Sequence, residues 1–250
     1  MRWSFSRVSS FEDCPYKWFL NYILKEEGHE RFYASYGTFM HDLLDGFYEG
    51  VYQKDELAME FLTNFSVRIK GERPAESTVQ SYIMKGVEYL NTFEPFVFDK
   101  IEVEKDLSFA VDGRPFIGFV DILGENDGDF YIVDHKSRDL GHRSKRKKPT
   151  LKDLELDEML KQLYVYSEGV FQTYGKYPEE LWFNCFKNQT IIKEKFDPER
   201  HQEVMRWLVQ TIEYIEEATD FPPQLDYFRC NYLCDHRENC VYYDTHFGKG

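Results

Sequence analysis

The Asp127-Gly128 pair, which separates two runs of alternating residues, constrains this 250-residue chain more than any other local feature. The runs PFIGFVDILG before the pair and DFYIVDHKS after it are rich in the β-branched and aromatic residues that favour strands. Asp-Gly favours a two-residue turn, because both central positions of such a turn need positive φ. The sequence therefore predicts an antiparallel hairpin in which Asn126 pairs with Asp129 and each step away from the turn adds one pair.

The predicted register sets two carboxylates side by side on neighbouring strands. Asp121 falls opposite Asp134, about 5 Å away at Cβ, and Lys136 shares the face of Asp134 because side chains alternate along a strand. Singly, Asp121 is a polar strand-end residue, and Asp134 with Lys136 is a surface ion pair. Opposed carboxylates destabilise a sheet unless they are neutralised, and a divalent cation does so with hard oxygen ligands. Together the three residues predict a metal site.

A second turn of the same kind extends the argument to a third strand. Asp112-Gly113 lies between the run FVFDKIEVEKDLSFAV and the run that contains Asp121. A two-residue turn there brings Glu104 opposite Asp121 and adds a third carboxylate to the row. Pro115 lacks the N–H that a sheet ladder uses, so we expect it to interrupt this pairing.

The rest of the chain changes between helical and strand periodicity. Apolar residues at helical spacing predict helices over 11–24, 37–50, 55–69, 77–93, 153–174 and 198–219. Alternation predicts strands over 96–111, 115–124, 129–137, 181–187 and 191–196. We find no internal repeat and no clear linker. The pattern predicts an α/β fold and a single domain over 1–250, with a helical insertion at about 51–95.

Charge argues first against and then for a nucleic-acid partner. The chain has 31 Lys and Arg residues against 45 Asp and Glu, a net charge of −14, whereas a phosphate backbone favours positive proteins. Five basic residues nevertheless fall within the run RSKRKK: Arg143, Lys145, Arg146, Lys147 and Lys148. Such a run is usually a solvated loop. It follows Lys136 closely, so beside a catalytic centre it could track a phosphate backbone.

Composition and terminal sequence predict a globular cytoplasmic protein. Hydrophobic residues make up 42% of the chain, which excludes a disordered class. No apolar run reaches the length of a membrane span, and the N-terminus lacks the apolar region of a secretory signal. The five cysteines are therefore interpreted as thiols or metal ligands before disulfides.

Three of these cysteines lie close together near the C-terminus. Cys230, Cys234 and Cys240 have the spacing Cys-x3-Cys-x5-Cys and need a fourth ligand for a tetrahedral zinc site or an iron–sulfur cluster. The candidates for that ligand are Cys14, Cys185, His236 and His246. Cys185 belongs to an apolar predicted strand and is interpreted as a core thiol. Cys14 lies in a polar opening and is the better candidate, which would tie the two ends of the chain together.

Taken together, these motifs resemble the PD-(D/E)XK nuclease superfamily, and in particular its RecB-like branch. Asp121 in GFVDIL corresponds to the acidic element that precedes the signature, and Asp134-x-Lys136 in YIVDHKS corresponds to (D/E)-x-K. The branch carries a metal-binding histidine on an upstream helix, and GTFMHDLLDGF offers His41 in that context.

Two further elements of the branch have counterparts here. Its Gln-x3-Tyr element, on the helix after the sheet, matches Gln162-x3-Tyr166 in KQLYVYSEG. Its iron–sulfur members, which include AddB-type helicase-nucleases and CRISPR adaptation nucleases, hold a [4Fe–4S] cluster with one cysteine near the N-terminus and three near the C-terminus. The cysteines that match this split are Cys14, Cys230, Cys234 and Cys240. Their C-terminal spacing is looser than is common in such clusters, and the stretch 51–95 has no matching motif.

The resemblance implies a restriction-endonuclease-like mixed β-sheet flanked by helices, with an iron–sulfur clasp that joins the N-terminal segment to residues of about 221–243. It implies a DNA exonuclease that hydrolyses phosphodiester bonds with Mg²⁺- or Mn²⁺-activated water. Its implied metal ligands are His41, Asp121, Asp134 and the backbone carbonyl of His135. Lys136 would orient the attacking water or stabilise the transition state.

The implied partner is DNA, as a single strand or as DNA ends, in repair or recombination. Gln162 and Tyr166 would position the DNA or the Lys136 side of the site, and the basic run 143–148 would contact the DNA. The chain has no Gly-x4-Gly-Lys-Ser/Thr motif, so any translocation must come from another protein, such as a helicase or a recombination or adaptation factor.

Alternatives stay open at several positions. On its helix alone, His41 also suits a pairing with Asp45, four residues further on, and Tyr166 also suits packing against the sheet. The competing function is a non-catalytic nucleic-acid-binding or assembly subunit that keeps the fold. A third interpretation is a zinc protein with Cys3His ligation through His236.

Overall fold

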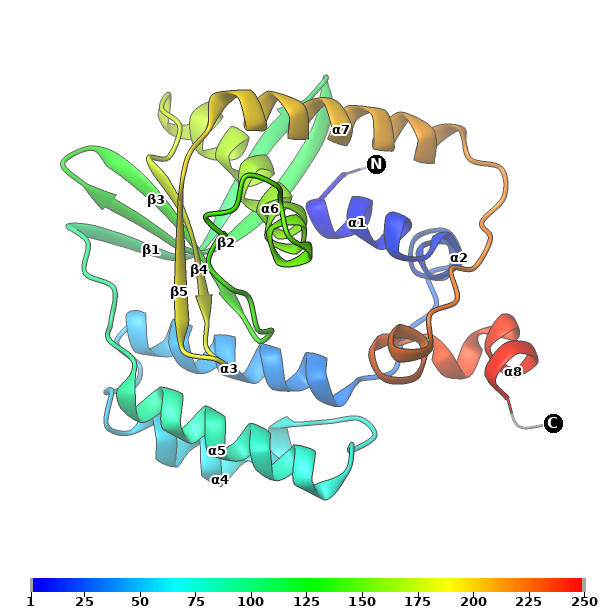
Figure 1. The fold of residues 1–250 in the computed structure, drawn as a ribbon, viewed down its shortest axis with the longest axis horizontal. Helices are drawn as coiled ribbons and strands as arrows, with labels where there is room; N and C mark the ends of the chain where they lie inside the picture. Colours follow the sequence, from blue (N-terminus) through cyan, green and yellow to red (C-terminus); the bar gives the residue numbers. More distant parts are fainter. Residues whose placement is uncertain (1, 249–250) are drawn as a thin grey trace.

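The computed structural model describes residues 2–248, which form a five-stranded sheet flanked by helices (Figure 1). The strands lie across the sheet in chain order: β1 (Lys100–Val111), β2 (Arg114–Asn126), β3 (Asp129–Lys136), β4 (Glu180–Cys185) and β5 (Thr190–Lys195). β3 and β4 run parallel, and the other neighbouring pairs run antiparallel. The predicted α/β class with a mixed sheet and flanking helices is confirmed.

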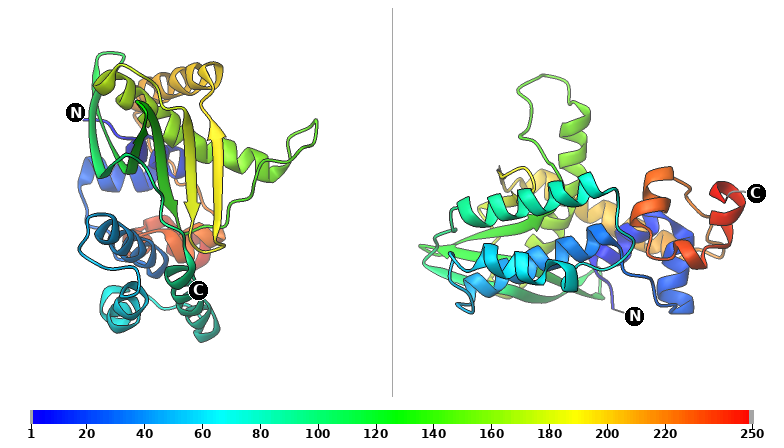
Figure 2. Two further views of the ribbon diagram at one scale, coloured as in Figure 1. Left: turned by 90° about the vertical axis from the view of Figure 1, so that its left-hand side faces the viewer. Right: turned by 90° about the horizontal axis from the view of Figure 1, so that it is seen from below.

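Helices cover the two faces of the sheet, as Figures 1 and 2 show. The helices are α1 (Phe5–Asp13), α2 (Pro15–Phe19), α3 (Phe32–Tyr48), α4 (Leu57–Arg68), α5 (Glu76–Thr92), α6 (Leu151–Tyr174), α7 (Pro198–Glu217) and α8 (Val241–Phe247). Ile132 on β3 packs into a core with α1, α6 and α7. Its neighbour Val133 faces the opposite side, where Tyr48 of α3 packs against it. Helices α3, α4 and α5 share a further core of their own. No helix within residues 2–248 is long and apolar enough to cross a membrane.

Both predicted Asp-Gly turns are present with the required backbone. Asp127 and Gly128 have φ of 50° and 81°, and Asp112 and Gly113 have φ of 49° and 73°. The register between β2 and β3 is the predicted one, from Asn126 opposite Asp129 to Ile122 opposite Val133. The turn residues therefore fix which side chains of the two strands come together.

The expected interruption at Pro115 was wrong. Pro115 pairs with Ala110 inside the β1–β2 ladder. Its carbonyl accepts a hydrogen bond from the Trp3 N–H at 2.9 Å, so the missing N–H of the proline faces Trp3 and not β1. Trp3, which is 2% exposed, thus occupies the edge of β2 beyond the end of β3.

The predicted continuous helix over 11–24 was also wrong. α1 ends at Asp13, and α2 begins at Pro15, which cannot donate the hydrogen bond that a helix interior needs. Cys14 lies between them with φ of −166°, in extended backbone. A π-helical turn over Leu20–Leu24 follows α2. The break turns Cys14 out of a helix and toward the C-terminal segment.

The loop between β3 and α6 projects from the body of the protein (Figure 2). Its return into α6 is fixed by Asp153, whose carboxylate accepts hydrogen bonds from the N–H and hydroxyl groups of both Ser144 and Thr150. These four bonds lower the pKa of Asp153. The basic run is therefore carried on a loop that is anchored where it enters the helix.

Candidate active site

The candidate site lies where β2 and β3 separate. The ladder between them ends at Ile122 and Val133, and β2 continues beyond it toward the N-terminal segment. The His135 N–H donates a 2.5 Å hydrogen bond to Asp121 Oδ2, in place of a further backbone pair. Asp121 is 9% exposed and Asp134 is 4% exposed. Two buried carboxylates thus meet at the fork of the sheet.

Lys136 extends this pair toward α6. Its Nζ lies 2.7 Å from Asp134 Oδ2 and donates to Gln162 Oε1 at 2.9 Å. Gln162 Nε2 in turn donates to the Tyr166 hydroxyl at 3.1 Å. A Cβ added to Gly118 would lie 2.6 Å from the Tyr166 ring, so only glycine lets the ring lie this close to β2. The four polar side chains form one hydrogen-bonded row.

His41 and Glu104 approach the fork from the other side. Ligand atoms of His41, Glu104 and Asp121 all lie within 4.8 Å of one another, and His41 Nδ1 is 3.5 Å from Asp121 Oδ2. The β1–β2 ladder skips Glu104, whose φ of 45° is uncommon for a residue other than glycine. Glu104 therefore reaches Asp121 from strained backbone, a feature that concentrates at functional sites.

Burial and crowding set the protonation of this group. Burial and the neighbouring Asp134 raise the pKa of Asp121 well above its usual value. Burial lowers the pKa of His41, which favours a neutral imidazole with a free lone pair. Burial and the nearby Glu104 raise the pKa of Asp45 to about 7. The site has more carboxylates than neighbouring cations can offset, and its oxygen and imidazole donors fit a hard divalent cation.

His135 is a buried neighbour of the two aspartates at the fork. It is 1% exposed, and burial lowers the pKa of its side chain. Its Nδ1 lies 3.0 Å from Asn184 Nδ2, which also donates to the Tyr89 hydroxyl. The ring centroids of His41 and His135 are 5.6 Å apart. The residue that carries the predicted carbonyl ligand thus lies next to the predicted imidazole ligand.

An open cleft of about 650 Å³ leads to the site. Its walls include His41, Glu104, Asp45 and Ser137. Sequence reasoning treated Asp45 only as an alternative partner of His41. The four-residue spacing from His41 was the signal that both side chains share one face of α3.

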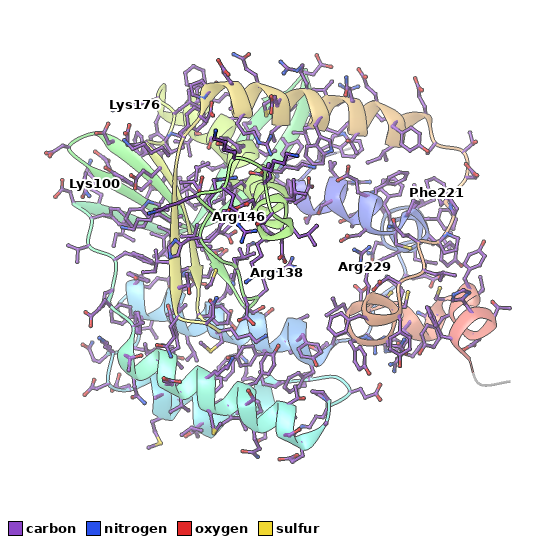
Figure 3. All side chains as sticks on the ribbon, viewed as in Figure 1. Lys100, Arg138, Arg146, Lys176, Phe221 and Arg229 are labelled. Carbon is purple, nitrogen blue, oxygen red and sulfur yellow. The ribbon has the colours of Figure 1, made fainter. Side chains whose placement is uncertain are left out.

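The members of the basic run differ in their surroundings. Arg143 is held in ion pairs with Asp157 at 2.9 Å and Glu194 at 3.1 Å. The other four basic residues of the run, at 145–148, are exposed and form no ion pair within residues 2–248. Figure 3 shows Arg146 on this loop, in front of the sheet.

Tyr166, the other predicted DNA contact on α6, is 8% exposed and so faces the protein interior.

The four cysteines of the predicted cluster line one cavity. Cys14, Cys230, Cys234 and Cys240 surround about 140 Å³ together with His236. Within residues 2–248, no three of their sulfur atoms lie within 4.8 Å of one another. His236 Nε2 lies 2.7 Å from Asn21 Oδ1. The structure therefore brings the four sulfurs together but not into a compact set.

Cys185 lies apart from this cavity. It is fully buried in β4, and burial raises the pKa of its thiol to about 11.

The C-terminal segment is tied to the N-terminal one by Arg229, whose side chain donates to the Asp13 carbonyl at 2.6 Å. Figure 3 shows Arg229 on the turn that carries the cysteines.

Comparison with known proteins decides the family. A model of the PD-(D/E)XK nuclease superfamily matches residues 2–241. The chain belongs to the PD-(D/E)XK nuclease superfamily. The structure of a Eubacterium rectale protein provisionally named an exonuclease has a similar fold, with a TM-score of 0.52 and 15% identity over 98% of this chain and 93% of the other. The structure of SSO0001 has a TM-score of 0.39, with 15% identity over 97% of this chain and 86% of the other. No curated protein matches the sequence.

Because the chain belongs to the PD-(D/E)XK superfamily, cleavage kinetics can test the hydrogen-bonded row at the fork. We expect Gln162→Ala to lower kcat about tenfold with little change in KM, because Lys136 loses the charge-assisted hydrogen bond that positions it. Steady-state cleavage kinetics would measure both constants. The matched control is Gln172→Ala on the same helix, where the amide bonds the backbone of Ala110 instead. An equal loss in both variants would contradict a positioning role for Gln162.

Proposed function

We propose that this PD-(D/E)XK protein is a metal-dependent DNA nuclease of the RecB-like branch that acts as an exonuclease. The observation that carries the proposal is the convergence of Asp121, Asp134, Lys136 and His41 at the fork between β2 and β3. The provisional name of the Eubacterium rectale protein agrees with exonuclease action.

We propose that His41, Asp121, Asp134 and the His135 carbonyl hold one Mg²⁺ or Mn²⁺, with Glu104 as a further carboxylate ligand. The compact set of His41, Glu104 and Asp121 supports this assignment, as does the burial of both aspartates. When bound, the cation would lower the pKa of a water molecule, so that the water loses a proton more readily and becomes a better nucleophile, and would offset negative charge on the phosphate.

Lys136 contributes a fixed positive charge at the mouth of this site. Asp134 and Gln162 hold its ammonium group from two sides. An ammonium in this position stabilises negative charge that develops on the phosphate oxygens, or orients the attacking water. The role of Gln162 and Tyr166 in this proposal is to position Lys136, and not to contact DNA directly.

We propose that four residues of the projecting loop contact the DNA backbone: Lys145, Arg146, Lys147 and Lys148. All four are exposed, and none of them forms an ion pair within residues 2–248, which supports this assignment. The two ion pairs of Arg143 make it an anchor for the loop and not a free phosphate contact. Four phosphate contacts predict that log K for DNA falls with log salt concentration with a slope of about −3.

We propose that the cysteine cavity holds a structural [4Fe–4S] cluster. All four sulfurs line one cavity, which supports this assignment, because a [4Fe–4S] cluster binds four cysteines, each through a different iron atom. The cluster would join the segment before α2 to the segment after α7.

A cleavage assay on end-labelled DNA tests the function. With Mn²⁺ or Mg²⁺, we expect the purified chain to shorten labelled single- or double-stranded DNA, and we expect EDTA to stop it. Asp134→Asn should abolish cleavage and weaken Mn²⁺ binding in calorimetry, because a buried ligand charge is lost. Cleavage that persists in EDTA, or in Asp134→Asn with unchanged Mn²⁺ affinity, would refute the assigned site.

A further inference from the structure

Three aromatic side chains form a continuous surface that starts in the catalytic cleft. Tyr33 lines this cleft and also lines a smaller hollow of about 150 Å³ shared with Tyr232. The ring centroids of Tyr33 and Phe228 are 6.5 Å apart, and those of Phe228 and Tyr232 are 5.3 Å apart. We call these three residues the aromatic ladder. Tyr33 belongs to α3, Tyr232 belongs to the π-helical turn (Arg229–Leu233), and Phe228 directly precedes that turn. The turn lies beside the first turns of α3 (Figure 1).

The outer rings of the ladder face water on a fixed backbone. Phe228 is 54% exposed and Tyr232 is 40% exposed, which is unusual for large rings that lie next to each other. Asn231 holds the turn, since its Nδ2 donates to the Tyr227 carbonyl at 2.7 Å and its own carbonyl accepts from Arg237 Nη1 at 2.9 Å. The rings are therefore presented by a rigid turn.

Cationic side chains lie among these rings. Arg73 lines the smaller hollow, is exposed and forms no ion pair within the described residues. Lys187 lies 5.3 Å from the Tyr82 ring, which is 5.5 Å from Tyr33, and Lys187 also pairs with Asp139 at 3.4 Å. Exposed aromatics beside cations suit a single nucleic-acid strand, because bases stack on the rings while phosphates meet the cations. A duplex keeps its base faces stacked and offers these rings little.

We propose that the aromatic ladder binds the bases of a single DNA strand whose phosphodiester lies in the catalytic cleft. This proposal rests on the proposed nuclease function and adds a strand preference to it. Tyr33 and His41 lie on the same helix, eight residues and so about 12 Å apart. At a rise of about 3.4 Å per nucleotide, this distance places Tyr33 about three or four nucleotides from the cleaved bond.

Binding by a catalytically inactive chain tests this proposal. In a Lys136→Ala background, fluorescence anisotropy is measured with a thymidine strand, an abasic strand of the same length and a duplex of the same length. We expect Phe228→Ala with Tyr232→Ala to weaken binding of the thymidine strand about tenfold and to leave the other two probes unchanged. Because binding is measured without cleavage, a chain that proves inactive on DNA would leave this test intact.

The matched controls separate stacking from structure. Tyr214→Ala removes a 67% exposed tyrosine from α7 and should leave all three affinities unchanged. Phe228→Trp with Tyr232→Phe keeps the ring faces and should restore thymidine binding. Unchanged thymidine binding in the double alanine variant, or an equal loss on all three probes, would overturn the proposal.

Discussion

Replacing Lys136 by alanine should lower kcat for DNA cleavage by about 100- to 1000-fold, the usual cost of removing one preorganised charge from a reaction centre. The loss should be this large because, beside the proposed metal ion, Lys136 is the cationic side chain held at the fork: its ammonium group pairs with Asp134, and burial biases His41 toward its neutral form. Single-turnover cleavage with saturating Mn²⁺ would measure the chemical step directly.

The control for Lys136 is Lys176, which lies between α6 and β4 and pairs with a residue of β3. Lys176 is in an ion pair with Asp129 at the far end of the hairpin, so Lys176→Ala removes one lysine and one ion pair but leaves the fork untouched. We expect it to retain nearly full activity. Circular dichroism and Mn²⁺ calorimetry should show that Lys136→Ala remains folded and still binds the cation. Full cleavage by Lys136→Ala would remove Lys136 from the reaction and with it the proposed site.

Replacing Cys14 by serine should remove most of the iron and lower Tm by roughly 10 °C, because folding energy supplied by a bound cluster is lost with the cluster. The unsubstituted protein should be brown, absorb broadly near about 400 nm and contain about four iron atoms per chain. Iron analysis and absorbance would be followed together with thermal unfolding. Purification and measurement without oxygen would protect the cluster.

Cys185→Ala is the matched control for this variant. It removes a buried thiol from the sheet and should cost about 1 kcal/mol in unfolding free energy while the iron content stays the same. Loss of iron in Cys185→Ala alone would redirect the ligand assignment. A colourless protein with one zinc ion per chain would refute the iron–sulfur proposal and favour the Cys3His alternative through His236.

Arg31 also ties the segment that contains Cys234 to the rest of the protein. The Arg31 guanidinium, 5% exposed, binds Glu238 through two nitrogens and donates from Nε to the Cys234 carbonyl at 2.7 Å. We expect Arg31→Ala to cost about 2 kcal/mol, less than a fully buried pair because Glu238 keeps contact with water. Limited proteolysis should then cut the chain beyond α7 first. Arg68→Ala, whose exposed pair with Asp42 is solvated, should leave that segment protected.

The sheet was predictable from sequence because its information is local. Two Asp-Gly pairs fixed both hairpins, and the predicted register between β2 and β3 holds as far as Ile122 opposite Val133, one step short of Asp121 and Asp134. The same reasoning placed Glu104 near Asp121. It did not predict the strained backbone of Glu104, because a φ of 45° has no sequence signature in glutamate. Local turn chemistry thus gave positions along the strands and not the conformation at each one.

Features that depend on distant segments could not be predicted in this way. The contact between Tyr33 and Phe228 joins residues that no periodicity links, and Phe228 was not singled out at all. Arg143 was grouped with its basic neighbours because the sequence does not show the partners Asp157 and Glu194. The break at Cys14 needed only the rule that proline ends a helix, which the apolar spacing of 11–24 concealed.

The bonds between Arg31 and Glu238 have a consequence for biosynthesis. These partners are separated by 207 positions, whereas neighbouring strands of each hairpin meet across a few residues. On a ribosome, which delivers the chain from its N-terminus, the sheet can assemble before the cysteine segment exists. Until that segment arrives, Arg31 lacks Glu238 and Tyr33 lacks Phe228, so the nascent protein passes through a stage in which these two side chains have not yet met their partners.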